Sequence, residues 1–447
     1  MVSQAAKQLN EYAEIFQAVA ESPGPETSWI RRLRDTAFDR FQQVGFPTTS
    51  DEEWKYTNVT PIVNGDFSPM VDDISPPSLT DEDIEGHLFA EARATSIVFI
   101  NGIFTPERSK LGALPDGVVV MDLLQATRTE EHGEAIRAEL ARQADYNEDG
   151  FTALNTALFG SGAFIRIPRG QQIDTPIHVL FLFEPRFAAI TTFPRLLIIS
   201  EEDSAATVIE SYAHSQDGPG FTNAVTEIVL QQAARLRHYR LQRESQEVFH
   251  VATTKVDLGP QSSYDTTAVT LGAKLSRHTI GVTMDHEGAE CWVDGLYMVD
   301  GTQHTDTHSL IDHRKPHCTS HQLYKGILNG KSRAVFNGKV FVRPGAQQTD
   351  AMQTNKNMLL SNDARVDTKP QLEIFADDVK CAHGAAIGQL DEDEIFYLES
   401  RGLRPELARN LLTYGFAEEV IEKIKIESIK RDLDAAVLNR LHAQLET

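Results

Sequence analysis

The chain has 447 residues, and its 65 Asp and Glu against 42 Lys and Arg give a formal net charge of -23. This balance excludes most nucleic-acid-binding proteins, which need a positive face to neutralise phosphates, and it disfavours adhesion to anionic lipid. Three cysteines in so long a chain cannot form a disulfide framework, so we expect a reducing compartment. The N-terminal sequence lacks a basic stretch followed by an apolar one, so we expect no secretory signal.

Residues 1–160 are predicted to form a mostly helical domain. Apolar residues recur there at helical spacing in two segments: Leu9, Tyr12, Phe16 and Val19 in the first, and Ile30, Leu33 and Phe38 in the second. Residues 64–83 are rich in Pro, Asp and Ser and predict a loop. Residues 96–104 predict a short hairpin that turns at Asn101-Gly102, and residues 131–144 predict a further helix.

The character of the sequence changes near residue 160, where helical signals stop for roughly two hundred residues. Short predicted strands alternate with polar or glycine turns, among them residues 163–167, 177–183, 196–200, 207–212, 225–230, 236–241, 248–258, 265–271 and 292–299. Turn residues followed by a small residue and a strand recur at intervals of roughly 27 to 30 residues, a range typical of repeat architectures. A repeat unit of stacked strands is therefore the first hypothesis for residues 161–388.

A helix-free run of this length excludes a parallel sheet with helical crossovers, which leaves a sandwich, a propeller or a solenoid. A propeller would repeat a blade signature every ~45 residues, and the sequence contains none. The repeat therefore favours a parallel β-helix, in which only the two end coils expose strand edges. Helical domains at both ends would protect those edges.

Residues 389–447 return to helical periodicity and predict a C-terminal helical domain. Acidic residues from Asp391 to Glu394 suit a helix N-terminus, where the helix dipole favours negative charge. Gly402 is a plausible helix end and Pro405 a plausible first residue of the next helix. The apolar stripe of these helices either docks in the groove of a partner or packs on the β-helix.

The sequence from Gly326 to Ser332 suggests a phosphate-binding loop, but only three residues separate its glycines where four are needed. The following residues, from Ala334 to Val342 with Asn337-Gly338 in the middle, predict a hairpin and no helix. A plain turn is the preferred interpretation, so we expect no nucleotide hydrolysis by this chain. Gly160-Ser161-Gly162 likewise lacks the third glycine of a dinucleotide fingerprint.

Five histidines and one cysteine cluster in a short stretch of the chain, a composition that can bind zinc or iron. They are His304, His308, His313, His317, His321 and Cys318. Their spacing matches no zinc finger, so the preferred interpretation is a set of histidines hydrogen-bonded to Asp306 and Asp312. A metal site stays the alternative.

Near the end of the β region, Cys381 and His383 stand two residues apart. On a regular strand both side chains point to the same face, while Lys380 points to the other. A thiolate and an imidazole form half of a coordination sphere for a soft metal or an iron–sulfur cluster. A hydrolytic pair is another possibility, and taken alone the favoured interpretation is a buried cysteine beside a turn histidine.

From about His304 to about Leu403 the sequence closely resembles the SufB/SufD family, the scaffold of the SUF iron–sulfur cluster assembly machine. The block KGILNGKSRAVFNGKVFVRPGAQQTDAMQTNKNMLLSNDARVDTKPQLEIFADDVKCAHGAAIGQLDEDEIFYLESRGL carries the resemblance. The segment from Glu53 to Thr57 and the segment from Phe99 to Gly102 are similar to the N-terminal part of the family. Cys-x-His-Gly at residues 381–384 and the absence of cysteine from residues 361–370 resemble the SufD branch, with SufB as the alternative.

The resemblance implies a right-handed parallel β-helix between helical domains, pairing with SufB, and binding of a SufC-type ABC ATPase. It implies a role for His383 in a transient iron–sulfur cluster at the SufB–SufD interface, with Cys381 a weaker candidate. It places ATPase binding on the C-terminal helices, beginning with Phe396, Tyr397, Leu398, Arg401 and Gly402. A typical cluster takes four thiolates, so a chain with three scattered cysteines would have to share the ligand set with its partner or use ligands other than cysteine.

Three expectations accompany this assignment. The chain is a non-catalytic scaffold subunit, located in the bacterial cytosol in preference to the plastid stroma, and able to pair with itself when isolated. A purely structural clamp that supplies no cluster ligand is the alternative function. Binding of FADH2, which is associated with the assembled complex in this family, is left open by the sequence.

Overall fold

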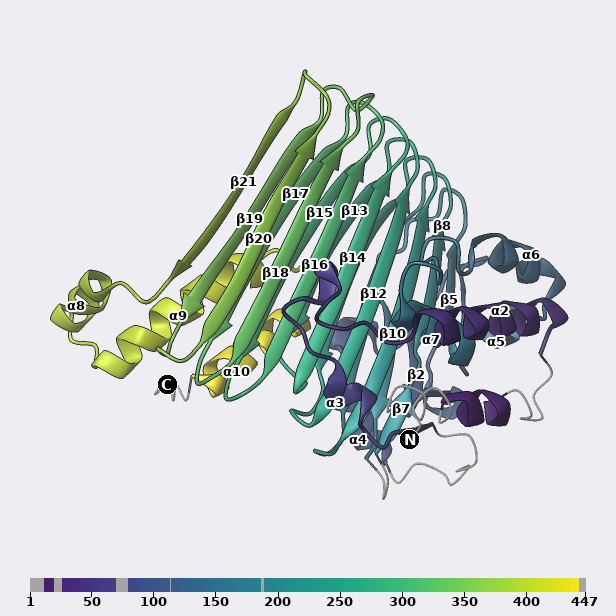
Figure 1. Cartoon of the computed structure of the whole chain (residues 1–447), viewed down its shortest axis with the longest axis horizontal. Coiled ribbons are helices and arrows are strands. Elements are labelled where there is room, and N and C mark those ends of the chain that lie inside the picture. The colour runs from purple at the N-terminus through teal and green to yellow at the C-terminus, as the bar shows by residue number, and fades with distance from the viewer. Residues whose placement is uncertain (1–11, 20–25, 70–78, 113, 186–188, 442–447) are drawn as a thin grey trace.

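The computed structural model describes residues 12–19, 26–69, 79–112, 114–185 and 189–441. Two long sheets face each other, with helices gathered at the N-terminal end and a second group of helices at the C-terminal end (Figure 1). None of the described helices is both long enough and apolar enough to cross a membrane.

The strands of the two sheets alternate along the chain, which therefore winds as a parallel β-helix and confirms the predicted fold. From β8 onward each strand pairs in parallel with the strand two places later in the sequence. Leu275 pairs with His304, and His304 pairs with Arg333, so equivalent residues recur at roughly 29-residue steps. The interval at which turn residues recur in the sequence is thus the length of one coil.

One sheet has eleven strands in the order β20-β18-β16-β14-β12-β10-β8-β5-β4, with β7 paired to β10 and β1 paired to β7. Its strands are β1 (Ser68–Pro69), β4 (Val119–Asp122), β5 (Gly162–Ile167), β7 (Ile190–Thr192), β8 (Arg195–Ser200), β10 (Gly220–Leu230), β12 (Val248–Leu258), β14 (Leu275–Met284), β16 (His304–His313), β18 (Arg333–Val342) and β20 (Arg365–Ile374).

The facing sheet has ten strands in the order β21-β19-β17-β15-β13-β11-β9-β6-β2-β3. They are β2 (Ser96–Ile100), β3 (Ile103–Phe104), β6 (Ile177–Phe183), β9 (Ala205–His214), β11 (Arg235–Arg243), β13 (Ser263–Thr270), β15 (Glu290–Val299), β17 (Thr319–Leu328), β19 (Asp350–Leu359) and β21 (Lys380–Gly388).

Helices precede and follow this double layer. Toward the N-terminus lie α2 (Ser28–Val44), η1 (Glu52–Trp54), α3 (Thr60–Val63), α4 (Asp81–Glu85), η2 (Ala90–Ala92), η3 (Pro106–Arg108), α5 (Leu123–Ala126), α6 (Glu130–Glu139) and α7 (Gly150–Leu158). Toward the C-terminus lie α8 (Glu392–Ser400), α9 (Pro405–Ile421) and α10 (Glu427–Arg440).

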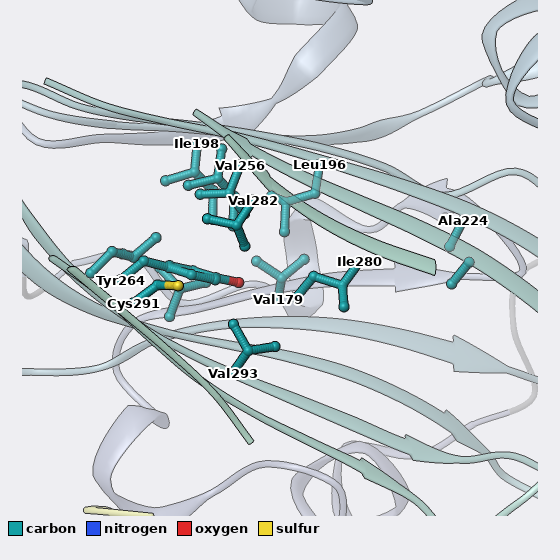
Figure 2. Packing of buried hydrophobic residues seen from close by; sticks show 14 of the residues in the cluster. Val179, Leu196, Ile198, Ala224, Val256, Tyr264, Ile280, Val282, Cys291 and Val293 are labelled. Carbon is teal, nitrogen blue, oxygen red and sulfur yellow. The ribbon is translucent and has the colours of Figure 1, made fainter. Parts of the chain in front are cut away.

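The hydrophobic core fills the lumen between the two sheets. Successive residues of a strand point to opposite faces, so every second side chain enters the lumen. Figure 2 shows Val256 and Val282 from one sheet meeting Tyr264 and Val293 from the other, and all four are buried. The stacking of such residues from coil to coil gives the fold its continuous core.

The lumen also contains a buried carboxylate with a full set of partners. His238 contacts Glu210 through Nε2 at 3.0 Å and Tyr264 through Nδ1 at 2.9 Å, and the Tyr212 hydroxyl donates to Glu210 Oε1 at 2.6 Å. Burial by itself would raise the pKa of Glu210, but His238 and the charge of Arg240 outweigh burial and lower this pKa to about 2. The carboxylate is therefore charged inside the core and compensated there.

The predicted N-terminal hairpin is confirmed, and its strands form part of one of the two sheets. β2 pairs antiparallel with β3 across Asn101 and Gly102, which both have positive φ. β2 also pairs in parallel with β6, so this hairpin extends the ten-stranded sheet. Leu9 and residues 70–78 of the predicted loop lie outside the described residues.

Two local predictions are wrong. The helix predicted over residues 131–144 ends at Glu139, because Ala141 takes a left-handed φ of 60° and its N–H donates to buried Glu227 Oε2 at 2.9 Å. The hairpin predicted at Asn337-Gly338 is the middle of the straight strand β18. A Cβ on Gly338 would lie 2.5 Å from the side-chain amide of Gln353, so glycine here makes room in the lumen and forms no turn.

Candidate functional site

The C-terminal end of the β-helix is an open edge in both sheets. β20 pairs only with β18, and β21 pairs only with β19, within the part of the chain that the structure describes. After β21 the chain leaves the sheet for α8, which projects beyond the lower end of β21 (Figure 1). An unpaired edge presents backbone N–H and C=O groups that can pair with another chain.

Cys381 and His383 lie on β21, on the face that points toward the lumen. Cys381 pairs with Ala351 and His383 with Gln353, and both of those β19 residues are buried. Because no further coil covers β21, His383 is exposed and Cys381 is half-buried. The predicted same-face arrangement is confirmed, and it places both side chains at the mouth of the lumen.

The Cys381 thiol is held in its protonated form at neutral pH. Burial, together with the negative charge of Asp350, raises the pKa of this thiol above its ordinary value. A thiolate is the form that binds iron, so binding at Cys381 would have to displace the proton. The other side chain, His383, carries an imidazole, which is the commonest metal ligand in proteins.

The mouth is bordered by large apolar side chains that a closed solenoid would cover. Exposed fractions are 57% for Phe375, 48% for Ile387 and 39% for Ile374. Ile374 pairs with Val342, which is fully buried one coil earlier. The end of the β-helix therefore exposes side chains that the next coil would bury in the interior of the solenoid, and exposed apolar groups of this kind are typical of interaction surfaces. The sequence analysis did not predict Phe375 and Ile387 as surface residues, although Phe375 directly follows β20 and Ile387 stands in β21.

The C-terminal helices divide into a covered part and an exposed part. α9 and α10 pack through Val420, Ile429 and Leu433 on the outer face of the ten-stranded sheet, which is where most of the predicted apolar stripe goes. On α8 only Ile395 is buried, whereas Phe396 is 70% and Tyr397 56% exposed.

The other predicted partner-binding residues surround this exposed pair. Leu398 is half-buried, and the Arg401 guanidinium stands 5.1 Å from the centre of the Tyr397 ring. Gly402 has a φ of 96° where the helix turns toward Pro405, the first residue of α9, as the sequence predicts. α8 also begins as predicted, with Asp391 accepting from the Asp393 N–H at 2.8 Å. The binding role of these residues stays a prediction.

The histidine cluster is spread over β16, β17 and a turn, and hydrogen bonds account for three of its members. His304 contacts Thr57, His313 contacts Ser320 at 2.8 Å, and His308 contacts Asp306 and Glu53. Among the described residues no set of three or more His, Cys, Asp or Glu side chains is arranged to hold a metal ion. The hydrogen-bonded interpretation is thus supported over a metal site within this chain.

The predicted hydrogen bond between a histidine of the cluster and Asp312 is wrong. Asp312 accepts from Arg343 Nε at 2.9 Å and Arg314 Nε at 2.8 Å, so arginines take the place predicted for a histidine. Cys291 and Cys318 are buried and free, and burial raises the pKa of both thiols. They act as small apolar residues, which leaves Cys381 as the cysteine at the mouth.

Comparison with known proteins agrees with this architecture over nearly the whole chain. The family model for the SufBD core domain, described as SUF system FeS cluster assembly, matches residues 186–416, and the model of the SufBD protein N-terminal region matches residues 6–179. The chain is 37% identical over 438 residues to an iron–sulfur cluster assembly SufBD family protein of Synechocystis sp., covering 96% of this chain and 95% of that protein. It is 30% identical to the iron–sulfur cluster assembly protein SufD of Escherichia coli, with 97% and 96% covered, and 32% identical to the chloroplastic protein ABCI7 of Arabidopsis thaliana, with 92% and 86% covered. The chain therefore belongs to the SufBD family of iron–sulfur cluster assembly proteins.

Proposed function

We propose that this chain is a SufD-type scaffold subunit that pairs with SufB through the open end of its β-helix. The observation that carries the proposal is the position of His383 and Cys381, which share the lumen mouth with exposed apolar residues. A second β-helix stacked on β20 and β21 would pair their edges and cover Phe375 and Ile387. Relatives named SufD in two bacteria favour this branch over a SufB-type role.

In this assembly His383 serves as a ligand for a nascent iron–sulfur cluster, which is the cargo of the complex. Cys381 is a second candidate once its proton is displaced. The partner supplies the remaining ligands, because Cys291 and Cys318 are buried in the lumen. The proposal gives this chain no permanent cofactor and no catalytic residue.

The second partner is a SufC-type ATPase on the C-terminal helices. Phe396 and Tyr397 form an exposed aromatic pair, with Arg401 beside the Tyr397 ring and Leu398 and Gly402 next to them. Aromatic and arginine side chains are enriched at the energetic centres of interfaces. α9 connects this pair to the β-helix because it packs on β15 and β17. Movement of a bound ATPase would therefore be transmitted through α9 to the β-helix.

We infer that ATP-driven closure of two SufC subunits pulls on these helices and opens the SufB–SufD interface. A nucleotide can bias a two-state interface only through its different affinity for the two states. Opening would let iron and sulfide reach His383. The alternative is a clamp that joins SufB and SufC and contributes no ligand.

A reconstitution experiment separates the ligand from the clamp. The complex of this chain with SufB and SufC is loaded with iron and sulfide, and the cluster is measured by its visible absorption and by bound iron. His383→Ala should lower the cluster yield while leaving the complex assembled. The control is His286→Ala, which removes an exposed turn histidine from another coil. A normal cluster yield with His383→Ala would contradict the ligand role and support the alternative, in which this chain only joins SufB and SufC.

Partner binding is tested by separate substitutions. Phe396→Asp should abolish co-purification with SufC and preserve pairing with SufB, since Phe396 lies on α8 and not on the edge strands β20 and β21. Phe375→Asp, at the mouth, should do the reverse. Retention of both partners by both variants would contradict the assigned surfaces.

A further inference from the structure

A large cavity lies at the N-terminal end of the molecule, far from the open mouth. It has a volume of about 670 Å³ and is bordered by the start of α2, the β2–β3 hairpin, α5 and β7. In Figure 1 α2 and α5 stand at the opposite end of the β-helix from β21 and α8. The cavity is as large as those that hold small organic ligands, and the proposed scaffold function makes no use of it.

The charges that line the cavity are unusual for this acidic chain. Among the described residues that line the cavity, Arg31, Arg34 and Arg128 are the cationic side chains and Glu26 and Asp122 are the anionic ones. Glu26 pairs with Arg34, its Oε1 lying 3.0 Å from the guanidinium. Asp122 caps α5 by accepting from the Gln125 N–H at 2.9 Å.

The other two arginines have no ion pair. Within the described part of the chain, neither Arg31 nor Arg128 has a carboxylate or a hydrogen-bond acceptor for its side chain. Both are exposed at the surface of the cavity. Although the chain has a net charge of -23, this cavity has two positive side chains without a negative partner. A bound anionic ligand would neutralise them.

Buried donors without acceptors point to the same conclusion. Arg34 is 7% exposed and its Nε has no hydrogen-bond partner, although its other nitrogens bind Glu26 and the Phe159 carbonyl. Thr191, at 2% exposed, lines the same cavity with an unpartnered hydroxyl. A buried polar group without a partner is costly and is expected to acquire one from a ligand.

The first turn of α2 adds backbone donors to this side of the cavity. Its N-cap Thr27 makes no side-chain cap, and the first turn has no acidic residue. The N–H groups of a first turn lack partners inside the helix and carry the positive end of its dipole. Ser28 and Arg31 of this 17-residue helix both line the cavity. Free N–H groups beside arginines are the usual surroundings of a bound phosphate.

We propose that this cavity binds a small phosphorylated molecule, with its phosphate at the start of α2 between Arg31 and Arg128. The phosphate carries two negative charges, which match the two unpaired guanidinium groups. Phe104 and Phe193 line the cavity and offer apolar surface to the rest of the molecule, and Ile103 at its border is 44% exposed. A monophosphate with an aromatic portion, such as a nucleoside monophosphate, fits this combination.

Calorimetric titration of the full chain with AMP and, separately, with inorganic phosphate tests the site. AMP should bind more tightly than inorganic phosphate, and added salt should weaken both. Arg31→Ala and Arg128→Ala should each weaken AMP binding about tenfold or more, because each removes a charge-assisted contact. Arg32→Ala is the matched control, since Arg32 is an exposed neighbour on the same helix that does not line the cavity.

Phe104→Ala distinguishes the two parts of the proposed ligand. It should weaken AMP binding and leave the binding of inorganic phosphate unchanged, with thermal melting confirming that the variant is folded. The proposal is overturned if neither probe binds at about 10 mM, a concentration that would detect even weak affinity. It is equally overturned if Arg31→Ala, Arg128→Ala and Arg32→Ala bind AMP alike.

Discussion

Glu53 and His308 lie 255 residues apart in the sequence, yet the imidazole Nδ1 contacts the carboxylate Oε2 at 3.0 Å. His308 Nε2 stands 3.0 Å from Asp306 Oδ1 on the same strand, so the ring bridges two carboxylates. The Thr57 hydroxyl donates to Asp306 Oδ2 at 2.5 Å. These contacts bind the N-terminal segment around Trp54 to the outer face of the eleven-stranded sheet.

Substitution of His308 by Gln should make the chain less stable at acidic pH than at alkaline pH, relative to the wild type. Burial alone would lower the pKa of His308, but the charge of Asp306 and the hydrogen bonds that the imidazole donates to Asp306 and Glu53 outweigh burial and raise this pKa. A raised folded-state pKa stabilises the protein fully below the unfolded value of about 6.5, and this stabilisation is lost as the pH rises through the folded value.

The measurement is the free energy of urea unfolding of both proteins between about pH 5.5 and 8.5. The difference between wild type and His308→Gln should be largest at the acidic end. His286→Gln, in an exposed turn, should show no such trend. A difference that does not change with pH would contradict a charged His308.

Substitution of Glu227 by Gln should be among the most destabilising single changes in the chain. Glu227 and Arg195 are both fully buried, with Oε2 and the guanidinium 2.5 Å apart. Glu227 also accepts from the N–H groups of Ala141, Gln143 and Ala144, which hold the chain after α6. Removing one partner leaves a buried charge uncompensated, so we expect a loss of about 3–5 kcal/mol in urea unfolding.

An exposed ion pair provides the contrast for this prediction. Lys369 and Glu52 are 3.2 Å apart, but their side chains are 47% and 80% exposed. Lys369→Ala should therefore cost less than about 1 kcal/mol. Equal losses from Glu227→Gln and Lys369→Ala would show that burial does not set the strength of these pairs.

Acid unfolding should depend on Glu210 in the lumen. Its folded-state pKa of about 2 lies below the unfolded value, so the stability that it contributes is present above about pH 4.3. That contribution is lost as the pH falls through the folded value. Glu210→Gln should remove this part of the acid dependence in circular-dichroism titrations, whereas Glu82→Gln on exposed α4 should keep it. An unchanged acid profile for Glu210→Gln would rule the contribution out.

Gly295 should tolerate no side chain while Tyr324 is present. A Cβ at Gly295 would lie 2.1 Å from the Tyr324 ring, which stacks over it from the next coil. We expect Gly295→Ala to cost about 1–3 kcal/mol by overpacking, and we expect Tyr324→Leu to recover part of this loss in the double variant.

A glycine in open space serves as the control for Gly295. A Cβ at Gly415 in α9 would meet no atom within 4 Å. Gly415→Ala should stabilise the chain by up to about 1 kcal/mol, because alanine favours the helix. Thermal melting compares the two substitutions directly, and destabilisation by both would count against the packing argument.

The sequence by itself determined the β-helix and the position of its helical flanks. Strand and turn residues recurring at the length of one coil leave few other folds, and the capping of α8 by Asp391 is a local interaction. The alternation of side chains along a strand was enough to place Cys381 and His383 on one face. These features depend on near neighbours in the chain, so a single sequence can reveal them.

Only the tertiary structure decided which residues meet across coils. Asn337-Gly338 has the composition of a turn, but stacking on neighbouring strands keeps it straight. The exposure of His383 follows from the position of β21 as the last strand of its sheet among the described residues. The contact of Glu53 with His308 follows from a segment folding back over the sheet. The repeat in the sequence gives the approximate length of a coil, but contacts between distant side chains also depend on how the lumen and the outer faces are packed, which local periodicity does not determine.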